Sequence, residues 1–255
     1  MTEHVEVTNE GGVLSLRLAR PDRRNAITVA MYAALAEAVK RAAEDATVRV
    51  IAITGAGEDF TAGNDLADFL KEMPAPGAES DIPVWRFLRA MANNVVPTVA
   101  AVQGNAVGIG TTLLLHCDLV LVEEGARLTM PFVDLGLVPE AASSLILPRL
   151  SGRRAAARHL LLGEPINAAQ ALHIGIASHI IPKGALAESL SEVLSRLLAK
   201  PAEALRQTQA LLRREATGEI LERMELENGH FAERLTSDEV KQAIAAFFAA
   251  RGKSA

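Results

Sequence analysis

Two short segments of this sequence, residues 62–66 (AGNDL) and 104–110 (GNAVGIG), carry residue types that suit chemistry on a carbonyl oxygen. Each follows an apolar, β-rich run and opens into a helix-like one, so each can direct backbone N–H groups toward a nearby oxygen. If the fold brings the two turns together, these N–H groups can form an oxyanion hole. Taken singly, each turn is also explained as a strand-to-helix connection, with glycine supplying the unusual dihedral angles.

Glu140 is the acid whose surroundings most favour proton transfer. It lies among small and apolar residues in segment 135–144. Burial there would raise the pKa of its carboxyl group and allow proton exchange near neutral pH, as a general acid–base requires. The alternative is a glutamate that caps or stabilises the start of a helix. Asp65 is expected to cap the helix after the first turn, and Asp134 is a less favoured second acid.

Other kinds of site are disfavoured by the motifs. The dinucleotide pattern G-x-G-x-x-G is not completed, because Leu113 stands where the last glycine belongs. The sequence has neither the G-x-x-x-x-G-K-[ST] of a phosphate-binding loop nor the G-x-S-x-G of an α/β-hydrolase. Its six histidines are scattered without paired ligand spacing, so we expect no metal site.

The composition indicates a folded protein with small partners. The 255 residues are 49% hydrophobic and 22% charged, which is enough for one large domain or one domain with an appendage. A formal net charge of −5 provides no broad attraction for nucleic acid or an anionic membrane. The single cysteine, Cys117, is expected in the core, and one cysteine fits a reducing compartment. Residues 1–10 lack the order of a signal peptide, and no apolar stretch reaches membrane-spanning length, so we expect a cytoplasmic protein.

The elements that must position the two turns follow an α/β pattern. We expect a β-hairpin around Gly11-Gly12 and a helix capped by Thr28. A loop is expected over residues 71–83, which are rich in proline. Further strands are expected over 48–54, 95–102 and 119–122, and helices over 186–198, 201–214, 220–235 and 237–250.

On these residues the sequence resembles the crotonase, or enoyl-CoA hydratase/isomerase, superfamily. The resemblance rests on four segments in the family's order, 20–26, 60–66, 97–110 and 163–175. It implies an α/β fold, a crotonase-like spiral of ββα repeats with a C-terminal helical region. We expect residues 1–195 to form the core with the acyl-CoA site and residues 196–255 to form a helical trimerisation region, giving a homotrimer or hexamer.

Within this superfamily the sequence is most similar to the Δ3,Δ2-enoyl-CoA isomerase branch. The resemblance implies that the backbone N–H groups of Asn64 and Ile109 hold the thioester oxygen and that Glu140 is the single catalytic base. The hydratase branch uses two glutamates, and this chain has Thr112 and Phe132 at those positions. We therefore expect conversion of 3-enoyl-CoA to 2-enoyl-CoA. The alternatives are an enoyl-CoA hydratase or other acyl-CoA-processing enzyme, or a non-catalytic acyl-CoA-binding protein.

The resemblance also implies a set of substrate-binding residues. Coenzyme A enters as part of the substrate, so no separate cofactor and no metal are expected. A basic turn suits its phosphates, although paired arginines are also common on solvated surfaces. The expected binding residues are Arg23, Arg24, Ala26, Ala62, Gly63, Asn64, Asp65, Leu66, Gly108, Phe132 and Pro139.

Overall fold

Short apolar strands build a six-stranded sheet and a smaller three-stranded one. The computed structural model describes residues 4–71, 82–213 and 216–252, so most of the loop predicted over 71–83 lies outside the described residues. The larger sheet has the order β1-β2-β3-β4-β6-β9, in which only the β1–β2 pair is antiparallel, and the smaller has the order β5-β7-β8. The β1–β2 hairpin around Gly11-Gly12 confirms the prediction. The strands are β1 (Val5–Glu10), β2 (Val13–Leu18), β3 (Val50–Gly55), β4 (Thr98–Val102), β5 (Asn105–Val107), β6 (Leu119–Glu123), β7 (Arg127–Thr129), β8 (Ile166–Asn167) and β9 (His179–Ile181).

The chain winds into a spiral whose turns each consist of two strands and a helix. β4 lies in the larger sheet, β5 follows it in the smaller sheet, and α4 (Ile109–Thr112) completes the turn. β6 and β7 repeat this passage, and α5 (Ser143–Ser151) follows them. This arrangement confirms the crotonase-like spiral of ββα repeats.

Strand alternation divides the buried side chains between two faces of the larger sheet. Val50 and Val99 pack with the apolar side chains of α8 (Leu186–Leu198). Ile51 and Ile53 belong to the main core, which also contains the apolar faces of α1 (Val29–Glu44) and α3 (Pro83–Ala92). The Thr28 hydroxyl accepts a hydrogen bond from the Met31 N–H at 3.3 Å, which confirms the predicted cap of α1.

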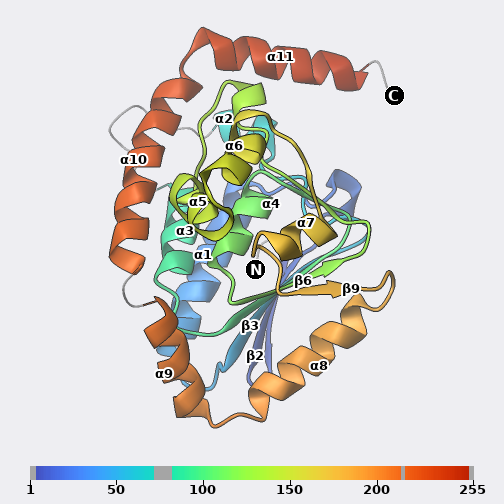
Figure 1. Ribbon diagram of the computed structural model, residues 1–255, viewed down its shortest axis with the longest axis vertical. Coiled ribbons are helices and arrows are strands. Elements are labelled where there is room, and N and C mark those ends of the chain that lie inside the picture. The colour runs from blue at the N-terminus through green and yellow to red at the C-terminus, as the bar shows by residue number, and fades with distance from the viewer. Residues whose placement is uncertain (1–3, 72–81, 214–215, 253–255) are drawn as a thin grey trace.

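The last helices wrap the core instead of extending away from it. In Figure 1, α10 (Thr217–Leu235) runs along one side of the molecule and α11 (Asp238–Gly252) crosses one end. Among the helices of the described ranges, we find none that combines the length and the apolar character needed to cross a membrane. The remaining helices are α2 (Leu66–Lys71), α6 (Arg153–Leu161), α7 (Ala168–His173) and α9 (Ala202–Arg213), with 3-10 turns at Pro21–Arg23 (η1), Leu113–His116 (η3) and Val133–Leu135 (η4).

Candidate active site

The two glycine-containing turns lie at one cavity of about 910 Å³. The cavity is also walled by Phe132 and Leu137, and by Phe231 of α10 and Ala243 of α11. All the predicted site residues line it except Pro139 and Glu140. Those that do are Arg23, Arg24, Ala26, Ala62, Gly63, Asn64, Asp65, Leu66, Gly108, Ile109 and Phe132.

Direct backbone contacts hold the two turns together. Thr61, which precedes the first turn, forms a parallel β-bridge with Ala106 in the second. Gly63 has a φ of +86°, and a Cβ atom there would lie 2.6 Å from the carbonyl oxygen of Val107. This close approach admits only glycine, because any other side chain would push the turns apart.

The N–H groups of Asn64 and Ile109 are available for a ligand. Ile27 pairs with the first turn through the Gly63 carbonyl, at 2.8 Å, and the Asp65 N–H, at 2.9 Å, so the intervening Asn64 N–H points away from it. Ile109 is the first residue of α4, where a helix leaves its N–H groups unpaired. Within the described part of the chain, neither N–H has a hydrogen-bond acceptor. Both residues line the same cavity, so their N–H groups are candidates for an oxyanion hole.

Glu140 is buried and is not among the residues that line the cavity. Its side chain is 1% exposed, and Oε1 accepts a hydrogen bond from the Thr112 hydroxyl at 3.2 Å. Burial raises the pKa of Glu140 to about 8; the Thr112 hydrogen bond opposes the rise, and the nearby Glu227 adds to it. Thr112 lies three residues after Ile109, which ties this carboxyl to the helix that begins at the candidate oxyanion hole.

Tyr32 connects the first turn to the surroundings of Glu140. Its hydroxyl donates a hydrogen bond to Oδ1 of Asn64, and its ring packs against Phe87 at a centroid distance of 6.0 Å. Burial, with a further contribution from the Glu140 charge, raises the pKa of Tyr32 well above its usual value. The hydroxyl therefore stays protonated and holds the Asn64 side chain by donation.

The basic turn contributes Arg23 and Arg24 to the lining of the cavity. Arg23 and Arg24 are both largely exposed, and the Arg24 guanidinium lies 3.7 Å from the Asp59 carboxylate. Asp65 accepts a hydrogen bond from the Asp68 N–H at 3.3 Å, as expected of a cap, and forms an ion pair with Arg20 at 2.7 Å. Burial opposes ionisation of Asp65, but the bonds from Arg20 and the backbone outweigh it and lower its pKa. This carboxylate is therefore committed to holding the first turn.

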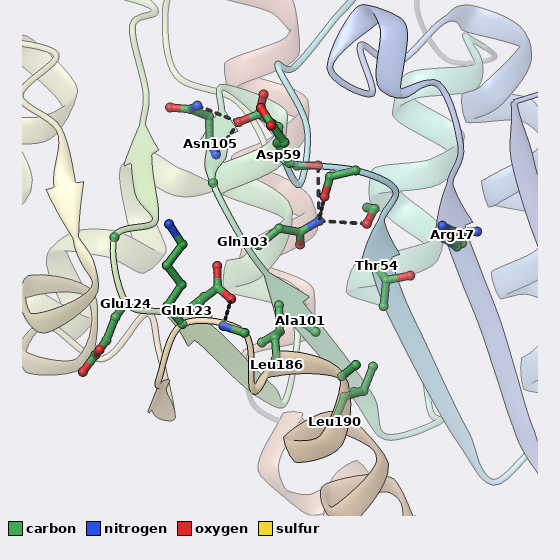
Figure 2. Close-up of a pocket in the computed structure, with 18 residues that line it drawn as sticks. Arg17, Thr54, Asp59, Ala101, Gln103, Asn105, Glu123, Glu124, Leu186 and Leu190 are labelled. Carbon is green, nitrogen blue, oxygen red and sulfur yellow. Dashed lines mark hydrogen bonds between the residues drawn. The ribbon is translucent and has the colours of Figure 1, made fainter.

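A second cavity, of about 850 Å³, contains none of the predicted site residues (Figure 2). Several of its polar side chains form hydrogen bonds within the protein: Asp59 accepts from the Asn105 side chain at 2.6 Å, and Gln103 donates to the Gly55 carbonyl at 2.8 Å. Glu123 likewise accepts from the Gly184 N–H at 2.8 Å. These contacts join neighbouring turns of the spiral, so we place the candidate active site in the first cavity.

Several residues around the site were not among the sequence predictions. Tyr32 and Arg20 donate hydrogen bonds to side chains of the first turn, Asn64 and Asp65. Phe231, from a distant part of the chain, lines the cavity. Glu227 of α10 hydrogen-bonds the backbone just after Glu140. Arg20 belongs to the matched segment 20–26, but no motif marks Tyr32, Phe231 or Glu227, because each acts through a contact between segments far apart in the sequence.

Comparison with known proteins identifies relatives along almost the whole chain. The family model described as enoyl-CoA hydratase/isomerase matches residues 8–254. The 1,2-epoxyphenylacetyl-CoA isomerase of Escherichia coli (strain K12) is 32% identical, covering 98% of this chain and 97% of that protein. Enoyl-CoA delta isomerase 2 of Rattus norvegicus is also 32% identical, over 97% of this chain and 64% of its own length. A solved enoyl-CoA hydratase/isomerase from Pseudoalteromonas atlantica T6c has a TM-score of 0.90 at 37% identity, covering 96% of this chain and 97% of that one.

Proposed function

The chain belongs to the enoyl-CoA hydratase/isomerase family, an acyl-CoA-processing family, and on that premise we propose that it is a Δ3,Δ2-enoyl-CoA isomerase. The observation that carries the proposal is a buried carboxyl group, Glu140, which Thr112 links to the helix that begins at Ile109, one of the two residues whose unpaired N–H groups lie at the cavity. The name of the rat relative gives it further support.

In the proposed reaction, Glu140 moves one proton along the acyl chain. Its carboxylate takes a proton from C2 of a 3-enoyl-CoA, and the electron pair moves toward the thioester oxygen to form a dienolate. The N–H groups of Asn64 and Ile109 donate to that oxygen; one such donor typically contributes about 10²–10³ in rate. The protonated Glu140 then returns the proton to C4, the double bond forms between C2 and C3, and the carbonyl is restored.

A pKa near 8 suits this shuttle, because the same group must first accept and then donate a proton at nearly equal cost. Thr112 is also placed for it, since its hydroxyl donates to the Glu140 carboxyl and stabilises the charged form.

Hydration is the less favoured activity. Thr112 and Phe132 stand where the hydratase branch carries its two glutamates, and Phe132 places an apolar ring on the cavity wall. Addition of water needs a group that activates it, whereas the isomerisation needs one carboxylate and a cavity without a competing water.

The proposal extends to binding, assembly and location. Arg23 and Arg24 are proposed to contact the phosphates of coenzyme A, while the pantetheine arm passes Ala62 to Leu66. The reaction as written uses no cofactor other than the coenzyme A of the substrate. We further propose a homotrimer or hexamer in the cytoplasm; light scattering and fractionation test these two statements.

The deciding experiment is an isomerase assay on purified protein with trans-3-hexenoyl-CoA, followed by the formation of 2-enoyl-CoA. Crotonyl-CoA hydration, thiol release and turnover of 1,2-epoxyphenylacetyl-CoA are measured in parallel. Isomerisation that is lost in the Glu140→Gln variant supports the proposal. Clear turnover in one of the parallel assays without isomerisation would assign a different reaction to the same site, and tight binding of several enoyl-CoAs without any turnover would indicate a binding protein.

A further inference from the structure

The backbone immediately after Glu140 adopts an unusual conformation. Ala141 and Ala142 have φ values of 60° and 54°, in the left-handed region that residues with a Cβ atom disfavour. Both are fully buried, and α5 begins directly after them. Two consecutive strained residues persist only where their surroundings hold them.

Glu227 of α10 restrains this turn with two hydrogen bonds. Its Oε2 accepts a hydrogen bond from the Ala142 N–H at 2.6 Å, and its Oε1 accepts one from the Ser144 N–H at 3.0 Å. These N–H groups belong to the start of α5, where a negative charge is favourable. Glu227 itself is only 5% exposed, so its two carboxylate oxygens are committed to this turn.

A second contact restrains the same turn, this time from a residue that precedes it in the chain. The Nε2 atom of His116 lies 2.8 Å from the Ala141 carbonyl oxygen. Burial lowers the pKa of His116 to about 4, so the ring is neutral at working pH and donates from Nε2. The turn is therefore held by a donor on its carbonyl and by an acceptor on its N–H groups.

Glu227 also lies close enough to Glu140 to act on its charge. Tyr32 from α1 and Thr112 from α4 act on Glu140, and the Ser144 hydroxyl and Arg223 from α10 act on Glu227, while His116 contacts the turn between them. Burial raises the pKa of Glu227, and the hydrogen bonds from Ser144 and Ala142 together with the charge of Arg223 oppose that rise and favour its ionised form. Arg223 also donates to the Ser144 hydroxyl at 3.2 Å. Glu227 is thus the one acid among these groups that adds to the raised pKa of Glu140.

We propose that Glu227 is a positioning residue, which fixes the left-handed turn after Glu140 and thereby sets both the location of the Glu140 carboxyl and the charge that it faces. The inference rests on the proposed function, because it treats Glu140 as the base. It makes α10, a helix of the C-terminal region, part of the working site.

The test replaces Glu227 with Gln and compares it with Glu225→Gln, the same change at an exposed position of the same helix. Gln keeps one acceptor oxygen but turns an NH₂ group toward a backbone N–H. At pH values above the Glu140 pKa, we expect kcat to fall about 10- to 100-fold with little change in KM, since a misplacement of about 1 Å costs on the order of 10² in rate. The rise of kcat/KM with pH should move to lower pH, because a like charge is removed.

A double variant separates positioning from a general loss of stability. Glycine adopts positive φ without strain, so adding Ala142→Gly to Glu227→Gln should recover part of the lost kcat. The proposal is overturned if Glu227→Gln matches Glu225→Gln in both kcat and pH profile, or if only its melting temperature falls.

A spectroscopic titration keeps this inference separate from the proposed function. In protein carrying ¹³C-labelled glutamate, the Glu140 carboxyl signal is identified by its loss in Glu140→Gln and then titrated with and without Glu227→Gln. If the wild type lacks isomerase activity, the proposed function fails, but a downward shift of the Glu140 titration still supports the role of Glu227. An unchanged titration overturns it whatever the activity.

Discussion

Replacing Glu140 with Gln should abolish isomerisation and yet make the folded protein more stable at alkaline pH. Burial raises the pKa of this carboxyl from 4.5 to about 8. Between these values the folded protein keeps a proton that the unfolded chain has released, so the free energy of unfolding falls as pH rises. Gln resembles the protonated carboxyl and does not titrate, so the variant avoids this loss.

The size of the effect follows from the shift. A rise of roughly three and a half pKa units, at about 1.4 kcal/mol per unit, gives an upper limit of about 5 kcal/mol. The advantage of Glu140→Gln should be absent below pH 4.5, grow between pH 4.5 and 8, and stay constant above that. Isomerisation should fall by at least ~10² over the same range, as expected for the loss of a general base.

The assay is denaturant unfolding of the wild type, Glu140→Gln and Glu225→Gln at pH 5 and pH 9. The exposed Glu225 controls for the loss of one surface charge, and its variant should show almost the same pH dependence as the wild type. If Glu140→Gln gains less than about 1 kcal/mol at pH 9 relative to pH 5, the carboxyl does not carry the raised pKa on which the proton shuttle depends.

Three further variants test other parts of the site. Thr112→Val removes a donor that favours the ionised Glu140, so the rise of kcat/KM with pH should move to higher pH; an unmoved profile would contradict the contact. Gly63→Ala should lower kcat and reduce stability by about 1–3 kcal/mol, as estimated for one strained residue, whereas Gly218→Ala, in open space on α10, should not; equal effects would refute the close-packed turn. Arg24→Ala should raise KM for acyl-CoA about tenfold, the loss of one charged hydrogen bond, without changing kcat. The same variant should leave KM for an acyl-pantetheine unchanged, and a change there would argue against a phosphate contact.

Elements with a strong local signal could be predicted from the sequence. The alternation of apolar residues on both sides of Gly11-Gly12 predicted the first hairpin, and the capping residue Thr28 predicted the start of α1. The helical pattern over 186–198 matches α8 in both bounds, because its leucine and valine side chains all pack against one sheet. In each case the residues that specify the element lie within it or directly beside it.

Elements that depend on distant partners were missed. β5, β7 and β8 contain two or three residues each, which is too few to show the alternation of apolar and polar residues typical of a strand. They form a sheet because successive turns of the spiral bring them next to one another. α3 was missed because it begins at Pro83, directly after the proline-rich segment that drew the loop prediction. Proline suits the first turn of a helix, so it marks a beginning here.

The candidate site likewise contains residues with a local signal in the sequence and residues that depend on distant partners. The two turns and Glu140 could be found because glycine spacing and an acid among apolar residues are visible along the chain. Glu227 left a weaker signal: it occupies the same helical face as Met224 and Phe231, both buried. A charged residue on an otherwise apolar stripe indicates a buried partner, but it does not say which one.

The cavity wall combines the basic turn near the start of the chain with Phe231, Ala243 and Ala246 near its end. Protein synthesis delivers these parts in order, so a growing chain that has completed both glycine turns and Glu140 still has an open site until α10 and α11 emerge from the ribosome and dock. A product interrupted before Phe231 would carry every proposed reacting group without the enclosure that shields a dienolate from water. The enclosure of the candidate site is therefore completed only when α10 and α11 have docked.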